Sequence, residues 1–427
     1  MTAKRVRRID ADRSINHVVA VVSMLIVIVV LYAGCSNMLS DDWIDPDLSR
    51  TGTVVPQEAM DGDNLGASIS TDGSHIVVGA TNAGGGTGAA YVLNGYSFRE
   101  IGVLTADDGQ AGDQFGVSVA VSSGQAIVGA QHEDGGEGDC VVDSGAAYLF
   151  SDATGIWQQT AVLRAGDAQT GDLFGSSVAI SGDWAFVGAV SEDGGAGDVS
   201  IDAGAVYVFH NDAGVWSQAD ILRAPDNLAS GAFGASLAVS GEWLMVGSPE
   251  RVSGAGGAFL FRFDGSVWAY ADVLAPFGRQ YGDLFGTTIA LSGDTAIIGA
   301  AGRATSTGTV YVFARDGDTW IEGPALVAPD GQPDDLFGNS VAMSYDWLLV
   351  GAPGEDGGEG DPLANAGSAY AFRFRAGAWE WASTLRAVPG AAADAFGTSV
   401  GIARAGFVVG ANQEGGTGAV HYYRSLP

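Results

Sequence analysis

Three short acidic segments are the residues of this sequence whose types could bind a metal ion. EDGGEGD occupies residues 133–139 and returns at 355–361, and the near copy EDGGAGD occupies residues 192–198. Carboxylates are the hard oxygen ligands that Ca²⁺ takes, and glycines let a backbone wrap an ion. The candidate calcium ligands are Glu133, Asp134, Glu137, Asp139, Glu192, Asp193, Asp198, Glu355, Asp356, Glu359 and Asp361. The order of acids matches no common calcium motif, so a solvated acidic loop is the competing interpretation.

No catalytic constellation accompanies these acids in the sequence. The histidines after the N-terminal leader lie in unrelated contexts, and none forms an HExxH-type pair. Phosphate-loop signatures are absent, and the Ser-Gly dipeptides belong to hairpin turns rather than to nucleophile elbows. We therefore expect a protein that is not an enzyme. A carbohydrate-active hydrolase or lyase using paired acids is the alternative.

The charge of the chain limits its partners. It has 50 acidic residues against 19 basic ones. Leaving out the leader removes Lys4, four arginines, Asp10 and Asp12. The rest of the chain then has 14 arginines and 48 acidic residues, a net charge of about −34. Such a surface repels nucleic acid and anionic lipid, and it attracts cations. Nucleic acid is therefore excluded as a partner, and the membrane is expected to be contacted only through an N-terminal anchor.

The N-terminus is expected to be a targeting segment rather than part of the fold. MTAKRVRR is basic, residues 18–33 are apolar apart from Ser23, and the run ends in LYAGC at Cys35. This ending resembles a bacterial lipoprotein signal, which implies lipidation of Cys35, and an uncleaved anchoring helix is the alternative. Either arrangement leaves the basic end in the cytoplasm and the body outside it. We expect an outer-membrane lipoprotein or an N-terminally anchored protein of the cell envelope.

The chain accordingly divides into a leader at residues 1–35, a short linker at 36–47 and a body at 48–427. With Cys35 acylated, Cys140 has no partner for an internal disulfide, and we interpret it as an incidental loop thiol.

An internal repeat predicts the elements that position the acidic segments. A Phe-Gly or Leu-Gly pair recurs seven times, beginning at Leu65, Phe115, Phe174, Phe233, Phe285, Phe337 and Phe396. In every unit, the glycine of a Gly-Ala or, once, a Gly-Ser stands 13 positions after the glycine of this pair. An aromatic residue follows 12 or 19 residues later, and in five units a tryptophan stands 9 residues after that aromatic. The chain is therefore seven copies of one supersecondary unit.

Each unit is expected to form four short strands joined by tight turns. The second strand is almost continuously apolar, as in VVGA and IVGA, which indicates a sheet covered on both faces. Four-stranded antiparallel sheets packed around an axis satisfy that pattern, so we predict an all-β, seven-bladed β-propeller over a β-solenoid. The last unit lacks its tryptophan strand, and residues 48–56 are predicted to complete it, closing the ring without a free sheet edge.

The repeat resembles the FG-GAP units of bacterial proteins and of the integrin α-chain head, over about residues 48–425. The resemblance implies an extracytoplasmic, cell-surface module for adhesion or scaffolding that recognises a protein or a glycan. A structural component of an envelope assembly is a further alternative. Integrin-type units hold calcium in a DxDxDG-like loop between the first two strands. Here that position reads TDGS, SSGQ, SGDW, SGEW, SGDT, SYDW or ARAG, so the family's metal site does not carry over.

The acidic segments lie between the second and third strands, in the three units where that gap is seven residues longer. In an antiparallel blade this loop shares a face with the connection to the next blade. That rim is the predicted binding surface, with calcium the possible cofactor. The recurring Asp two residues before the Phe is expected to cap a turn, and the tryptophans to pack blade against blade.

Overall fold

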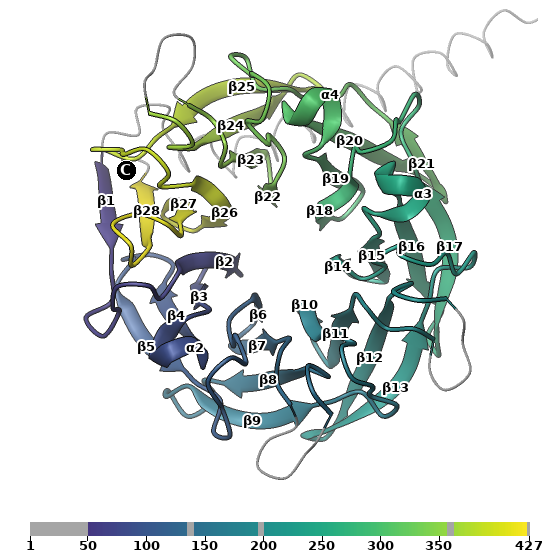
Figure 1. The fold of residues 1–427 in the computed structure, drawn as a ribbon. Coiled ribbons are helices and arrows are strands. Elements are labelled where there is room, and N and C mark those ends of the chain that lie inside the picture. Colours follow the sequence, from purple (N-terminus) through teal and green to yellow (C-terminus); the bar gives the residue numbers. More distant parts are fainter. Residues whose placement is uncertain (1–49, 135–140, 195–199, 357–362, 425–427) are drawn as a thin grey trace, which may run out of the picture.

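The structure is a computed structural model that describes residues 50–134, 141–194, 200–356 and 363–424 of the 427-residue chain. In these ranges, seven four-stranded antiparallel sheets are arranged as a ring (Figure 1). Each sheet is one blade, with its first strand nearest the centre of the ring and its last strand on the outside (Figure 1). The predicted all-β, seven-bladed propeller is confirmed.

The strands of each blade follow one another along the chain. Blades 1 and 2 are β2 (Leu65–Thr71), β3 (His75–Ala80), β4 (Ala89–Asn94), β5 (Glu100–Leu104), β6 (Ser118–Ser122), β7 (Gln125–Ala130), β8 (Ala146–Ser151) and β9 (Gln158–Leu163). Blades 3 and 4 are β10 (Phe174–Ser181), β11 (Trp184–Ala189), β12 (Ala205–Asp212), β13 (Val215–Leu222), β14 (Ser236–Ser240), β15 (Trp243–Gly247), β16 (Ala258–Phe263) and β17 (Trp268–Leu274).

Blades 5 and 6 are β18 (Phe285–Ser292), β19 (Thr295–Ala300), β20 (Thr309–Asp316), β21 (Thr319–Glu322), β22 (Ser340–Ser344), β23 (Trp347–Ala352), β24 (Ser368–Arg375) and β25 (Ala378–Leu385). Blade 7 contains β26 (Phe396–Ala403), β27 (Gly406–Ala411) and β28 (Ala419–Arg424). Single helical turns, α2 (Ala83–Gly86), α3 (Arg251–Gly254) and α4 (Arg303–Ser306), occupy the short loops of blades 1, 4 and 5.

The N-terminal strand closes the ring. β1 (Arg50–Val54) pairs antiparallel with β28, in a register that runs from Arg50 opposite Arg424 to Val54 opposite Val420. In Figure 1 the purple start of the described chain therefore lies beside its yellow end. Because β1 supplies the fourth strand of blade 7, the edge of β28 is covered, and the predicted closure is confirmed.

The repeated glycines allow neighbouring blades to approach closely. A Cβ on Gly129 would lie 1.9 Å from the carbonyl oxygen of Gly175, the Phe-Gly glycine of the next blade. The same oxygen accepts a hydrogen bond from the Ser118 hydroxyl at 2.7 Å. Five further serines make this bond at their own blade boundaries, namely Ser68, Ser177, Ser236, Ser340 and Ser399. The glycine spacing was visible in the sequence, but the role of these serines was not recognised from it.

The tryptophans at fixed register pack against the preceding blade, as predicted. The ring of Trp157 meets His75 of blade 1 edge-on, with centroids 5.5 Å apart. Trp268 meets Phe186 of blade 3 at 5.0 Å, and Trp320 meets Trp243 of blade 4 at 6.0 Å. Aromatic contacts of this kind add stabilisation beyond the apolar area that they bury. The result is a rigid ring from which the loops project.

Candidate functional site

One rim of the ring carries both the loops between second and third strands and the connections between blades; we call it the loop rim. Backbone hydrogen bonds tie each loop to the following connection. In blade 2 the N–H of Gly171 donates to the carbonyl of Val142, and that of Leu173 to Asp143. In blade 3, the N–H of Ser230 donates to Ile201. The prediction that loops and connections share a face is confirmed, and the opposite rim, with the hairpin turns, is called the turn rim.

The first acid of each heptad is buried and paired with an arginine of its own blade. Glu133, Glu192 and Glu355 are each 1% exposed. Their carboxylates lie 2.9, 2.7 and 3.2 Å from the guanidinium groups of Arg164, Arg223 and Arg386, respectively. Each arginine stands directly after the outermost strand of its blade, 31 residues beyond the glutamate. The pair therefore anchors the start of the long loop to the outer edge of the blade.

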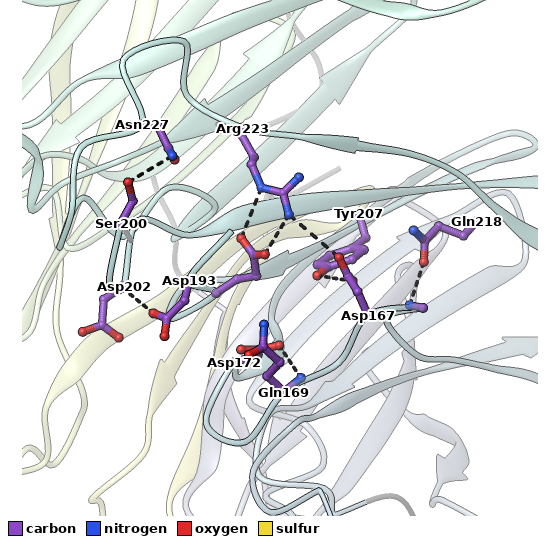
Figure 2. Close-up of polar contacts among 12 residues, drawn as sticks. Asp167, Gln169, Asp172, Asp193, Ser200, Asp202, Tyr207, Gln218, Arg223 and Asn227 are labelled. Atoms are coloured by element: carbon purple, nitrogen blue, oxygen red, sulfur yellow. Dashed lines mark hydrogen bonds and ion pairs between the residues drawn. The ribbon is translucent and has the colours of Figure 1, made fainter. Parts of the chain in front are cut away.

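Each of these arginines also reaches a carboxylate in the preceding connection. In blade 3, Arg223 lies between Glu192 and Asp167, with 3.9 Å to the second carboxylate (Figure 2). The Tyr207 hydroxyl donates to Asp167 at 2.8 Å, so that carboxylate has two partners (Figure 2). Blade 6 repeats the set with Arg386, Asp330 at 3.2 Å and Tyr370, and blade 2 pairs Arg164 with Asp108 at 3.0 Å.

The energetics of this network follow from burial and charge. Burial lowers the pKa of the Arg223 guanidinium, but the hydrogen bond and negative charge of Glu192 outweigh it, so the pKa is raised overall. Arg386 is shifted in the same direction for the same reasons, with Glu355 as its partner. Each arginine therefore stays charged beside a buried carboxylate, and the network holds the base of the loop in one geometry.

The second acid of each heptad closes the base of its loop. An oxygen of Asp134 accepts the backbone N–H of Asp143 at 2.8 Å, and Asp193 accepts that of Asp202 at 2.8 Å (Figure 2). Asp356 accepts the N–H of Asn365 at 2.9 Å. These are structural roles that the sequence pattern did not reveal. Asp143 also contacts the His132 ring at 2.8 Å.

The predicted calcium ligands include both described and undescribed residues. Among the heptad acids, Glu137, Asp139, Asp198, Glu359 and Asp361 lie outside the described residues, as do Cys35 and Cys140. The described part of the chain holds no group of three or more His, Cys, Asp or Glu side chains placed to hold a metal ion. The six heptad acids that are described bond to arginines or to backbone N–H groups. Calcium binding at the heptads stays a prediction.

The Asp two residues before the Phe or Leu caps a turn in six of the seven units, as expected. Asp172 is buried, and its carboxylate accepts the backbone N–H of Gln169 at 2.7 Å (Figure 2). The same bond, at 2.6 to 2.7 Å, is made by the equivalent aspartates Asp63, Asp113, Asp283, Asp335 and Asp394. Burial raises the pKa of Asp172 to about 6, although the N–H of Gln169 opposes the shift, and the charge of Glu192 adds to it. Asp335 is raised to about 6 by burial and the charge of Glu355, again against a backbone N–H.

These shifts predict that the protein is more stable at pH 5 than at pH 7.5. A carboxyl whose folded pKa is raised above 3.8 favours the folded state while protonated, and that contribution is lost as pH rises through 6. The lowered pKa values of Asp72 and Asp264 act below 3.8, outside this window. Changing both Asp172 and Asp335 to Asn should weaken the difference between these pH values by roughly 1 kcal/mol per site, because an amide keeps the acceptor oxygen without titrating.

Urea unfolding at the two pH values measures this difference. The exposed Asp212→Asn variant, on the turn rim, is the control and should keep the wild-type pH dependence. Equal pH dependence in the wild type and the Asp172→Asn/Asp335→Asn variant would contradict the assignment.

The charge pattern reverses in blades 4 and 5. Arg251 and Arg303 stand four residues after the Gly-Ala or Gly-Ser glycine of their blades. Blades 2, 3 and 6 have the buried glutamate at this position. The outer-strand arginine is replaced by Ala275 and Val327 in the same blades. Arg251 pairs with Asp226 and Arg303 with Asp283, both from the preceding connection. The sequence analysis missed this exchange, although an alignment of the seven repeats contains it.

A basic and aromatic area follows from that exchange, and we call it the blade 4–5 sector. It comprises Arg251, Val252, Phe277, Arg279 and Tyr281, from the α3 loop and the connection that follows β17. Phe277 is 95% exposed and Tyr281 78% exposed. Val252, Ala255, Arg279, Gln280 and Tyr281 line a shallow hollow there. In Figure 1 the neighbouring α3 and α4 mark this part of the ring.

Blade 7 departs from the predicted spacing by one residue. Counting 12 residues from Gly410 predicts Tyr422 as the aromatic residue of the third strand. In the structure His421 takes that place. It pairs with Val409, just as Tyr91 pairs with Val78 in blade 1 and Tyr148 with Val128 in blade 2. The loop between β27 and β28 is one residue shorter than in blade 1, which shifts the count. The His421 ring contacts Glu414 at 2.5 Å and the Thr53 hydroxyl at 3.3 Å, so β1 joins the loop rim through it.

The leader lies outside the described residues, so its boundaries and the lipidation of Cys35 stay predictions. Within the described ranges, no helix has the length and apolar character needed to cross a bilayer.

Comparisons with known proteins agree with the fold. The family model described as FG-GAP repeat matches residues 49–93, 98–150, 157–209, 272–313 and 320–372, together more than half of the chain. No curated protein matches this sequence. Among solved structures, a chain of Kuenenia stuttgartiensis hydrazine synthase is similar with a TM-score of 0.56 and 10% identity, covering 87% of this chain and 99% of that chain. Identity that low shows the fold alone. Taken with the seven blades and their Phe-Gly spacing, the matches show that this chain belongs to the FG-GAP repeat family.

Proposed function

We propose that this protein is an extracytoplasmic binding module, anchored by its N-terminus, that recognises a protein or glycan through the loop rim in adhesion or scaffolding. The observation that carries the proposal is large apolar side chains exposed on that rim. Besides Phe277 and Tyr281, they include Met60, Val142, Ile201 and Val388. Exposed apolar side chains of this size, supported by a rigid scaffold, are typical of interaction surfaces.

The scaffold supports this proposal because it pre-organises the rim. The Glu–Arg–Asp networks and the capped turns hold both ends of each long loop in one geometry. A surface that is ordered before binding loses less conformational entropy when a ligand arrives. Catalysis by a hydrolase or lyase has no comparable support among the described residues, and it is the alternative that the following experiment separates.

The proposal predicts that ligands found by screening lose affinity when the loop rim is altered. The purified full-length chain is screened on glycan and protein arrays, with calcium and with chelator. A Phe277→Ala/Val388→Ala variant should weaken binding at least about tenfold, as expected for exposed apolar contacts. Tyr345→Ala, equally apolar and 89% exposed in the β22–β23 turn of the turn rim, should leave binding unchanged.

The outcomes distinguish the candidate functions. Cleavage of bound glycan, detected by mass spectrometry, would favour the hydrolase or lyase. Loss of binding in Tyr345→Ala but not in the loop-rim variant would contradict the choice of rim. A loss of binding with chelator would support the calcium prediction, and identical binding in both buffers would oppose it.

A further inference from the structure

The connection between blades 4 and 5 carries side chains that the fold does not require. Counting back from the next Phe or Leu, Arg279 occupies a position held elsewhere by Ala59, Gly109, Ala168, Asn227, Gly331 and Gly390. Tyr281 occupies one held by Asp61, Ala111, Thr170, Ala229, Pro333 and Ala392. Six blades therefore make the same connection with neutral or small residues at the Arg279 position and without an aromatic at the Tyr281 position. The two side chains are additions to the surface of this one sector.

Exposure indicates that these additions serve a contact. Tyr281 and Val252 are exposed and line the hollow, and Phe277, four residues before Tyr281, exposes a second aromatic ring on the same connection. The walls of the hollow also include Ala255, which is buried beneath them. Exposed aromatic side chains near an arginine are the composition that dominates binding energy at protein interfaces.

The positive charge at the hollow favours an anionic ligand. The Arg279 guanidinium donates one hydrogen bond to the carbonyl of Gly256 at 3.0 Å, and no carboxylate of the described residues pairs with it. Burial lowers its pKa, and the positive charge of Arg251 lowers it further. Arg251 is itself held by Asp226 and lies over the Phe259 ring, with 5.5 Å to the centroid. An anionic ligand on Arg279 would offset the repulsion between the two guanidinium groups, because the carboxylate already present there, Asp226, pairs with Arg251.

We propose that the blade 4–5 sector binds an acidic polypeptide segment, with a ligand carboxylate on Arg279, an apolar side chain between Tyr281 and Val252, and further apolar contact on the exposed Phe277 ring. Charge complementarity selects the carboxylate, and the hollow's apolar walls select the neighbouring side chain. A glycan is less suited, because sugar hydroxyls need several polar partners and the hollow's lining supplies only Arg279, Gln280 and the Tyr281 hydroxyl. This inference rests on the proposed binding function and names its partner.

A peptide selection tests the assignment. A displayed library of random decapeptides is selected on the full-length chain and, separately, on its Arg279→Glu variant. Peptides enriched only by the wild type should pair Asp or Glu with Leu, Phe or another large apolar residue. Their dissociation constants, from fluorescence anisotropy, should rise at least about tenfold in Arg279→Glu and in Phe277→Ala/Tyr281→Ala. Replacing Asp and Glu in the peptide by Asn and Gln should have a similar effect.

Matched controls separate this site from general charge effects. Arg375→Glu makes the same charge change at an exposed position of the turn rim, and Tyr345→Ala removes an exposed aromatic there. Both should bind the selected peptides like the wild type, and melting curves should show that all variants are folded. Failure to enrich acidic peptides, or equal affinity in Arg279→Glu, overturns the proposal. If oligogalacturonate binds the sector and acidic peptides do not, the partner is wrong while the binding function stands; if no array or library ligand is bound at all, both fail.

Discussion

Replacing Arg223 with leucine is expected to lower the free energy of unfolding by about 3–5 kcal/mol. The variant leaves Glu192, which is 1% exposed, without its one charged partner among the described residues, and it removes the nearby charge from Asp167. A buried carboxylate without a counter-charge pays a desolvation cost that leucine packing does not recover. Urea unfolding at pH 7.5, followed by tryptophan fluorescence, measures the loss.

Two further variants decide whether the buried charge is the cause. Glu192→Gln/Arg223→Leu removes both charges, so most of the lost stability should return, because replacing a buried ion pair as a unit costs little. Arg375→Leu, at an exposed position of β24, should change stability by only about 0.5 kcal/mol. If the double variant is as unstable as Arg223→Leu, the loss comes from arginine packing rather than from the unpaired glutamate.

Changing Gly129 to alanine is expected to cost more than about 4 kcal/mol, or to prevent folding. The added Cβ would lie 1.9 Å from the carbonyl oxygen of Gly175 and 2.4 Å from the Ser118 hydroxyl. The carbonyl belongs to the backbone of the next blade, so relief of the clash requires separating two blades rather than turning one side chain. The yield of soluble protein and the thermal midpoint are the measurements.

A second glycine provides the control for this clash. Gly182 lies in the β10–β11 turn with φ +58°, and nothing lies within 4 Å of an added Cβ. Gly182→Ala should cost only about 1 kcal/mol, the usual penalty for the left-handed conformation. If the two variants are equally stable, close approach of the blades is not the reason for the repeated glycine.

Most of the fold could be predicted from the sequence because the repeat is strict. A fixed offset of 13 positions between two glycines sets the length of a hairpin, and seven copies of it leave few architectures besides a propeller. The missing fourth strand of the last unit and the surplus strand at residues 48–56 predicted the closure that β1 and β28 make. Blade 7 shows the limit of counting, because one residue fewer in its loop placed His421 where Tyr422 was expected.

The candidate site was less predictable, since its contacts join residues that are distant in the chain. Nothing near Glu192 indicates that its carboxylate will be buried against Arg223, 31 residues later. One signal was available: the three units with the longer loop have both the glutamate and the arginine, blades 4 and 5 lack both, and blade 7 has Glu414 without the arginine. Comparing the repeats with one another, rather than with known metal motifs, would have revealed the ion pair.

The sequence by itself determined the number of blades, their strands, the closure and the rim on which the acidic heptads lie, because these depend on spacing and apolar pattern. Only the tertiary structure decided what the side chains do there. It turned the first two acids of each heptad into anchors for the loop. It also brought Arg279 and Tyr281 to one hollow with Val252 from another loop, where the charge of Arg251 acts on Arg279. The burial of a side chain and its charged neighbours are set only when the ring closes. These two properties distinguish an acid that holds a loop in place from a surface that binds a partner.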